Sequence, residues 1–145
     1  MGVWKTDVWH RKVNKYWQRS NKHLMDLEKH MREGELIQAS EKAWGAISAL
    51  INTFYVHYHK KEVRKVRDKE KAFEEICRRY PSLRNMLITE ETTERKFMRK
   101  LYGLHEYFYG GRYILSNEQI FRSLKLSKPI LSELKQKISE DIFRS

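Results

Sequence analysis

Hydrophobic residues in the N-terminal third of the chain recur at steps of three and four, the spacing of one face of an α-helix. The first stripe predicts a long helix from near Lys12 to Arg32 and consists of Val13, Trp17, Ser20, Leu24, Leu27 and Met31. Gly34 supplies the positive-φ position that ends a helix at low cost. A second helix is predicted from Glu35 to about His59, with a stripe of Leu36, Ala39, Ala43, Ile47, Leu50 and Phe54 and a parallel one of Ile37, Trp44, Ile51 and Tyr55. Because their connection is short, the two helices form an antiparallel hairpin, and the wide apolar face of the second predicts the central helix of a bundle.

The middle of the chain shows the same spacing in shorter segments. Residues 60–67, KKEVRKVR, form a basic extension or linker. Asp68 is the expected cap of a third helix, which Pro81 ends because proline disfavours helix at the residue before it. A short apolar link is expected next, with Leu83, Met86, Leu87 and Ile88.

The C-terminal third predicts three helices, each with a signal at its start. Residues 89–91, Thr-Glu-Glu, place acids at the positive end of a fourth helix, which Gly110 and Gly111 end and whose stripe is Phe97, Leu101, Leu104 and Phe108. Ser116 with Gln119 fits a capping box that opens a short helix. The segment Ser127–Pro129 is the expected start of a separate last helix.

These patterns, without any strand-period alternation, predict an all-α antiparallel helical bundle of about five to seven helices led by the long hairpin. Residues 12–145 are expected to form one bundle domain, with residues 1–11 as an N-terminal arm or short helix. The single cysteine, Cys77, excludes an internal disulfide and a multi-cysteine metal site. The basic N-terminus lacks the apolar run of a signal peptide, and no window approaches ~18 uninterrupted apolar residues. A cytoplasmic protein with no membrane association is therefore expected.

The formal net charge is +11, and two regions supply most of the excess. Residues 1–23 carry six positive charges and one negative, and residues 57–87 carry ten and five. Lysine and arginine contacts to phosphates release counterions, so such clusters favour a partner such as RNA or DNA; a solvated basic surface that serves solubility is the alternative. The candidate contacts are Lys60, Lys61, Arg64, Lys65 and Arg67, and in the N-terminal region Arg11, Lys12 and Lys15. In that region aromatic residues alternate with basic ones, a pattern typical of base stacking, unless Trp9, Val13 and Trp17 fold onto the bundle.

Two segments resemble a known family. Residues 30–50, HMREGELIQASEKAWGAISAL, resemble the signature of the archaeal PaREP-type proteins, which are related to the HEPN helical domains, and residues 104–111, LHEYFYGG, are similar to a second signature of that family. The resemblance implies a HEPN-like bundle with a leading hairpin and frequent homodimerisation through a helical face. The small-residue face of the second helix, or the stripe of the fourth, is the expected pairing surface. The Trp-rich N-terminal segment departs from the family pattern.

The resemblance also implies a candidate catalytic pair. HEPN members that are metal-independent RNases carry an Arg followed, after four to six residues, by a His, and here Arg99 and His105 have five residues between them. The Arg would hold the scissile phosphate, and the His would act as acid or base on the ribose hydroxyl. Lys100 replaces the usual polar residue after the Arg, and six helical steps turn about 600°, so the two side chains point about 120° apart. His105 could instead hydrogen-bond within the bundle.

No cofactor or metal site is predicted. His57 and His59 diverge on a helix, His23 and His30 are too far apart for one ion, and the chain has no Gly-rich phosphate loop. Three functional hypotheses follow: a non-enzymatic helical module that associates with nucleic acid, an RNase that uses the Arg/His pair, and a structural dimer or toxin-antitoxin-like partner of another protein.

Overall fold

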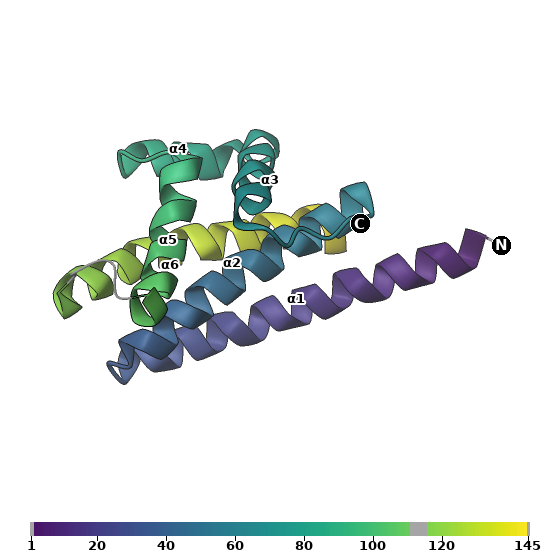
Figure 1. Cartoon of the computed structure of the whole chain (residues 1–145). Helices are drawn as coiled ribbons and strands as arrows, with labels where there is room; N and C mark the ends of the chain where they lie inside the picture. The colour runs from purple at the N-terminus through teal and green to yellow at the C-terminus, as the bar shows by residue number, and fades with distance from the viewer. Residues whose placement is uncertain (1, 111–115, 145) are drawn as a thin grey trace.

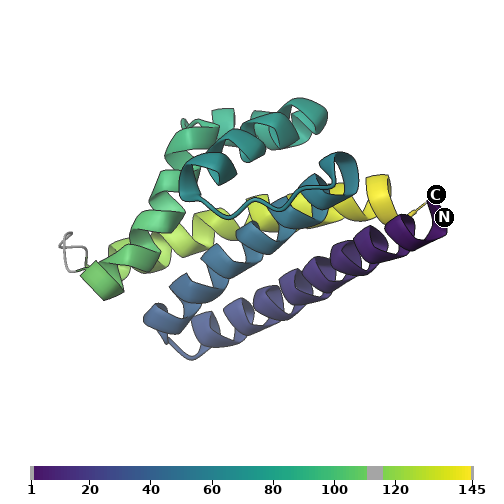
Figure 2. The same cartoon turned by 45° about the vertical axis from the view of Figure 1, so that its right-hand side comes forward.

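The computed structural model describes the backbone of residues 2–110 and 116–144 and the side chains of residues 8–104 and 116–144. Within these residues all regular structure is helical, and no strand is present, as the sequence predicts. Six α-helices and a short π-helix follow one another: α1 (Gly2–Arg32), α2 (Leu36–His59), α3 (Val66–Arg79), α4 (Pro81–Thr89), α5 (Glu94–Gly110), α6 (Asn117–Ile138) and η1 (Ser139–Phe143). Helices α1, α2 and α6 lie side by side, with α2 in the middle, and α3, α4 and α5 lie over this layer (Figures 1 and 2).

Helices α1 and α2 form the predicted antiparallel hairpin. Gly34 turns the chain at φ +72°, and backbone bonds from Gly34 N to Met31 O (3.2 Å) and from Glu35 N to His30 O (2.8 Å) close the end of α1. The helices approach closely at Gly45, where an added Cβ would lie 3.0 Å from Nε2 of His23. A glycine in a helix costs stability relative to alanine, so its presence here is explained by close packing.

The central position predicted for α2 is confirmed. Its small side chains are almost fully enclosed, including Ala39, Ala43, Ala46 and Ala49, at 0–3 % exposure. The stripe of α5 is also internal, with Phe97, Leu101 and Leu104 at 2–5 %. The described residues of both surfaces expected to pair two copies are therefore buried within one chain, while the Phe108 side chain lies outside the described residues.

Helix starts differ from the expected ones in three places. Helix α1 begins at Gly2 rather than near Lys12, because residues 2–11 continue it without a break. Helix α3 begins at Val66, which places Asp68 in its first turn instead of at its cap. Helix α5 begins at Glu94, because the hydroxyl of Thr93 accepts a hydrogen bond from Lys96 N (3.2 Å) and so acts as the cap.

The segment after Tyr80 is a helix rather than the expected apolar link. Pro81 opens α4 at its first position, where a missing N–H costs nothing, and Leu83 and Leu87 are buried on its inner face. Proline thus both ends α3 and starts the next helix.

Helix α6 begins at the predicted capping box but does not end where a separate last helix was predicted to start. Ser116 and Gln119 form the predicted capping box, with bonds of 3.1 and 2.9 Å. The separate helix expected at Ser127 is wrong, because α6 runs on through Pro129 to Ile138. Ser127 is buried, and its hydroxyl donates to Leu124 O (2.7 Å) within α6, so it does not cap a helix. Pro129 has no N–H to donate to the carbonyl of Lys125, one turn earlier in α6. Both residues are exposed, so this carbonyl can accept a hydrogen bond from water instead.

The C-terminal π-helix is fastened to the bundle by one carboxylate. Asp141 accepts hydrogen bonds from Tyr58 Oη (2.6 Å), Tyr80 Oη (2.7 Å) and Arg79 Nε (2.7 Å), while Arg79 Nη2 reaches its second oxygen (3.0 Å). Burial and the neighbouring carboxylate raise the pKa of Tyr58 to about 12. This Asp141 clasp joins η1 to α2 and to the α3–α4 junction. Phe143 adds a ring contact to Trp17 of α1, at 4.7 Å between centroids.

Within the described part of the chain, no helix combines the length and the apolar character needed to span a bilayer.

Candidate functional site

The basic segment between α2 and α3 is held in place by one buried amide. Asn52 of α2 donates to Val63 O (3.0 Å) and Ser48 O (3.1 Å), and its oxygen accepts from Val63 N (2.7 Å). Asn52 and Val63 are both 5 % exposed. Lys60 adopts a left-handed conformation (φ 53°) that ends α2. Residues 60–65, hereafter the connection, therefore have a defined path across α2.

Glu62 of the connection brings the two basic regions of the sequence together. Its carboxylate accepts hydrogen bonds from Tyr16 Oη of α1 (2.7 Å) and Arg64 Nη2 (2.9 Å), and Lys12 Nζ of α1 lies 4.0 Å away. The hydrogen bonds from Arg64 and Tyr16 lower the pKa of Glu62. Cations separated by about fifty positions in sequence thus share one surface.

Five of the other predicted contacts lie on α1, the connection and α3, and they have no carboxylate partner among the described residues. Arg11 and Lys15 are exposed on α1, Lys61 and Lys65 are exposed on the connection, and Arg67 is exposed on α3. None of the five has a carboxylate within 4.0 Å among the described side chains. Lys60 is also exposed, and its Nζ donates to His57 O (2.9 Å) of its own helix end.

A cleft of about 570 Å³ opens beside the junction, between α1, α2, the connection and α3. Its charged lining is entirely basic, with Arg19 of α1, Arg64 of the connection and Lys69 of α3. Lys69 is half-buried; its Nζ donates to Ser48 Oγ (3.2 Å) and lies 5.2 Å from the ring centroid of Trp44. Burial lowers the pKa of Lys69. We call this the basic cleft.

His23 lies on the wall of the basic cleft, against Gly45. Its Nδ1 is buried without a hydrogen-bond partner in the structure. Burial, and secondarily the charge of Lys42, lower the pKa of His23, so the neutral imidazole is favoured. The histidine therefore adds no positive charge at neutral pH.

The candidate catalytic residues share helix α5, but the structure shows only one of their side chains. Arg99 is exposed, and its Nε lies 3.3 Å from Oε1 of Glu70, a 9 %-exposed residue of α3. The side chain of His105 lies outside the described residues. Arg99 therefore has a structural partner that ties α5 to α3.

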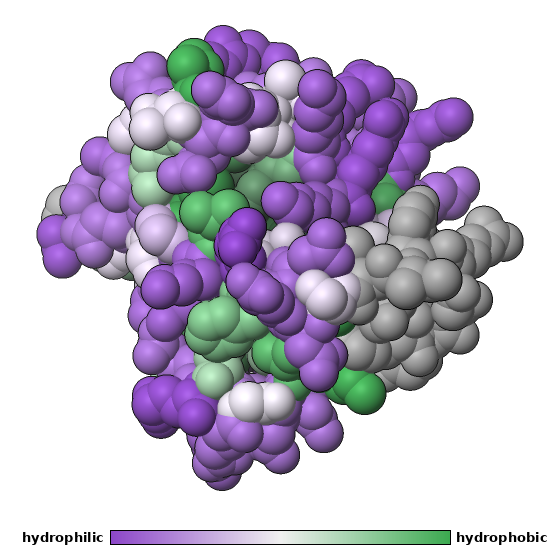
Figure 3. All heavy atoms as spheres, turned by 90° about the vertical axis from the view of Figure 1, so that its left-hand side faces the viewer, coloured by the Kyte–Doolittle hydropathy of each residue, from purple (hydrophilic) through white to green (hydrophobic). Residues whose placement is uncertain are grey.

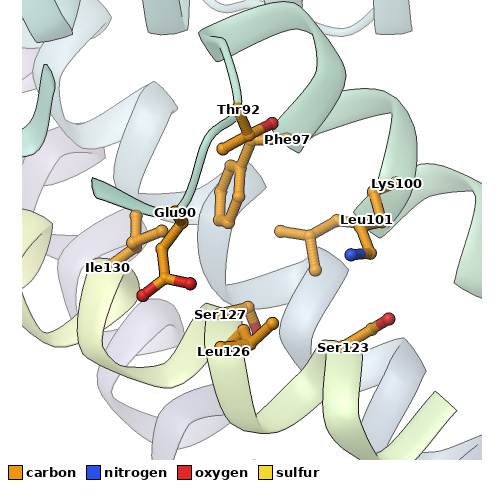
Figure 4. Close-up of a pocket in the computed structure, with 9 residues that line it drawn as sticks. All are labelled: Glu90, Thr92, Phe97, Lys100, Leu101, Ser123, Leu126, Ser127 and Ile130. Atoms are coloured by element: carbon orange, nitrogen blue, oxygen red, sulfur yellow. The ribbon is translucent and has the colours of Figure 1, made fainter. Parts of the chain in front are cut away.

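An apolar cavity of about 60 Å³ lies at another place, between the α4–α5 turn, α5 and α6. The Phe97 ring and the Leu101 side chain point into it, and Glu90 and Lys100 lie on opposite sides of its mouth (Figure 4). A wider hollow of about 440 Å³ continues along α6 past Leu126, which is 41 % exposed. The space-filling view shows apolar surface on this end of the molecule, interrupted by hydrophilic side chains (Figure 3).

Sequence reasoning missed a cluster at the hairpin turn. One ligand atom each of His30, Glu33 and Glu35 lies within 4.8 Å of the others, and His30 Nδ1 is 2.9 Å from Glu35 Oε1. Spacing rules for a continuous helix could not find it, because the chain reverses at Gly34. Cys77 is buried as expected, and burial raises the pKa of its thiol to about 12.

Fold and surface together define an all-α helical bundle with an N-terminal hairpin and a basic cleft at the junction of α1, α2 and α3. The sequence comparison then gives the family. The chain belongs to the archaeal PaREP1/PaREP8 family, which it matches over residues 15–121, from within α1 to the first turns of α6. No curated protein matches it.

Proposed function

We propose that this protein is a non-enzymatic, HEPN-like nucleic-acid-binding module that contacts the phosphates of a strand through the surface formed by α1 and the connection. The observation that carries the proposal is the junction at Glu62, where Lys12 of α1 and Arg64 of the connection share one carboxylate. A phosphate backbone is a line of charges, so a surface that extends over two elements can contact several phosphates at once.

The state of the surrounding cations supports this proposal. Arg11, Lys15, Lys61 and Lys65 are exposed and lack carboxylate partners among the described residues, so contact with a strand breaks no internal ion pair. Half-buried Trp9 adds an aromatic ring to this surface, with Lys12 Nζ 4.9 Å from its ring centroid. Aromatic rings next to cations are typical of surfaces that bind single strands.

Fluorescence anisotropy with a labelled single-stranded RNA, repeated with the matching DNA, tests the proposal over a range of salt concentrations. Arg11→Gln/Lys15→Gln and Lys61→Gln/Lys65→Gln are each expected to weaken binding and to reduce the slope of log K against log salt by about 0.7 per lost phosphate contact. The control Lys96→Gln/Lys125→Gln removes two exposed lysines from α5 and α6 and is expected to bind like wild type. Equal weakening in all three variants would mean that only net charge matters, and absence of binding to either strand would remove the proposal.

A denaturing gel of the same RNA in EDTA tests the catalytic alternative. We expect intact RNA with wild type, since Arg99 is paired with Glu70 and structurally engaged. Cleavage by wild type that is lost in His105→Ala would replace binding by metal-independent catalysis.

The homodimer implied by the resemblance, and the separate hypothesis of a protein partner, remain proposals. Light scattering on the eluting protein is expected to give twice the mass of one chain. Because the Ala-rich face of α2 and the stripe of α5 are internal, a dimer must use another surface. A single-chain mass at all concentrations would exclude it. Recovery of one stoichiometric protein from a nuclease-treated native extract would favour the toxin-antitoxin-like alternative.

A further inference from the structure

Lys69 is a charged group that the chain itself does not neutralise. It is half-buried, and no carboxylate of the described residues lies within salt-bridge distance of its Nζ. Its polar contact is the Ser48 hydroxyl at 3.2 Å, and its ammonium lies over the Trp44 ring, 5.2 Å from the centroid. A lysine side chain normally reaches water at little cost, so withdrawing an unpaired ammonium from solvent is unfavourable.

Two arginines from different elements line the same cleft. Arg19 comes from α1 and lies over the Tyr16 ring, 5.2 Å from its centroid, without a carboxylate partner in the described part of the chain. Arg64 comes from the connection and keeps one partner, Glu62. Both are exposed, whereas Lys69 is half-buried, so the cleft has an inner cation and two outer ones. Three cations around a space without a lining carboxylate attract an anion.

The remaining donors suit an oxyanion. The Ser48 hydroxyl accepts from Lys69 and keeps its own hydrogen to donate, and each guanidinium offers a planar pair of N–H groups that matches two oxygens of one phosphate. The cleft, at about 570 Å³, is large enough for a phosphate with part of the group that carries it. Trp44 is only 9 % exposed and packed on Tyr102, so its ring is not a platform for a base.

We propose that the basic cleft is a phosphate-binding subsite, in which Lys69 contacts the oxyanion from inside and Arg19 and Arg64 contact it from the opening. The phosphate belongs either to the nucleic-acid strand, in which case the subsite rests on the function proposed above, or to a free phosphate or mononucleotide, in which case it stands alone. The chemistry recognised is the same in both.

Isothermal titration with inorganic phosphate and with uridine monophosphate, in a buffer free of other oxyanions, tests the subsite directly. Wild type is expected to bind both. Lys69→Met keeps the length of the side chain and is expected to weaken binding about tenfold or more, and Arg19→Gln to weaken it less. Lys71→Met is the matched control, because Lys71 is exposed two positions along α3 and does not line the cleft. Circular dichroism confirms that each variant is folded.

The outcomes separate the subsite from the nucleic-acid function. If wild type gives no heat and no thermal shift with tens of millimolar phosphate, the subsite proposal is wrong even if the protein binds RNA. It is also wrong if Lys69→Met and Lys71→Met bind phosphate equally well. Phosphate binding that depends on Lys69, in a protein that does not bind RNA, would support the subsite with a small-molecule source and remove the proposed function. If Lys69→Met loses both phosphate binding and RNA binding while Lys71→Met keeps both, the phosphate bound in the cleft belongs to the nucleic-acid strand.

Discussion

Removal of the Asp141 carboxylate is expected to be among the most destabilising single changes outside the apolar core. Asp141→Ala leaves the hydroxyls of Tyr58 and Tyr80 and the guanidinium of Arg79 without their common acceptor. Tyr80 is 6 % exposed, so its hydroxyl cannot readily turn to water. The π-helical turn η1 then loses its polar attachment to α2 and α3.

The size of the effect follows from these contacts. A hydrogen bond to a charged group contributes about 1.5–3 kcal/mol net, but bonds that share one acceptor are not additive. The Arg79 side chain is 45 % exposed and regains water when released, so its two bonds contribute less than two buried ones would. We therefore expect Asp141→Ala to lower the free energy of unfolding by about 3 kcal/mol, a drop in Tm of roughly 10 °C for a chain of this length.

The pH dependence of this loss identifies the charge as its cause. The hydrogen bond from Arg79 is the largest influence on Asp141 and, with those from Tyr58 and Tyr80, lowers the pKa of its carboxyl well below the ordinary value despite partial burial. A carboxyl with a lowered pKa stabilises the folded state above its unfolded pKa of about 3.9 and loses this contribution as pH falls through the folded pKa. The stability difference between wild type and Asp141→Asn should be constant above about pH 5 and shrink below pH 4.

Urea unfolding followed by circular dichroism, at pH 7 and at intervals down to pH 2.5, measures both quantities. Glu118→Gln is the control, since Glu118 pairs with Arg122 between fully hydrated side chains and is expected to contribute less than about 0.5 kcal/mol. An Asp141→Ala protein within 0.5 kcal/mol of wild type, or a difference from Asp141→Asn that does not change with pH, would refute the reasoning.

Four further predictions concern helix packing, the connection and the buried thiol. Gly45→Ala is expected to destabilise the hairpin by about 1–3 kcal/mol, because the added Cβ would lie 3.0 Å from His23 Nε2; Gly103→Ala, where a Cβ meets nothing within 4 Å, is expected to stabilise by about 0.5–1 kcal/mol in the same thermal melts. Asn52→Ala removes two hydrogen bonds to Val63 of the connection and one to Ser48 O of α2, and it should cost about 2–3 kcal/mol in urea unfolding and weaken RNA binding in the anisotropy assay; unchanged binding would show that the path of the connection is irrelevant. The Cys77 thiol, with its pKa raised to about 12 by burial, should react with a thiol reagent on the order of 100-fold more slowly in the native protein than in urea.

The sequence predicted the elements whose signals are local. The end of α1 at Gly34 and the extent of α2 follow from a turn residue and two long stripes, and the capping box of Ser116 and Gln119 acts within one helical turn. Such features depend on residues three or four positions apart, and no distant contact competes with them.

Sequence signals gave wrong predictions where tertiary contacts decide the outcome. Pro129 was expected to open a helix, but α6 continues through it because buried Leu124 on one side and Leu131 on the other anchor the same face to the core. Residues 1–11 were expected to be an arm or a separate short helix, but α1 continues without a break to Gly2, beyond the end of α2 (Figure 1). Packing energy and helix continuity outweigh a single unfavourable residue.

The candidate site shows the same contrast between features that local sequence signals predict and features that arise only from tertiary contacts. Clustered charge identified Arg64 and Lys12, but nothing in the spacing of the chain could show that Glu62 joins them. Lys69 was not singled out at all, because its unusual feature is its burial without a carboxylate. Only the approach of α3 to α2 beside Trp44 creates that feature.

The difference between exposed lysines and half-buried Lys69 distinguishes the two explanations of the net charge, which are anion binding and solubility. Exposed lysines such as Lys61 and Lys65 cost the fold nothing, so they would be equally expected in a surface that serves only solubility. A half-buried lysine without a carboxylate lowers stability, and solubility gives no reason to place one there. Proteins accept such costs at sites that bind a ligand. If Lys69→Met unfolds at a higher temperature than wild type while phosphate binding is lost, the basic cleft retains its charge for an anion; if stability falls and phosphate binding is unchanged, Lys69 serves the packing around Trp44 and the charge needs no further explanation.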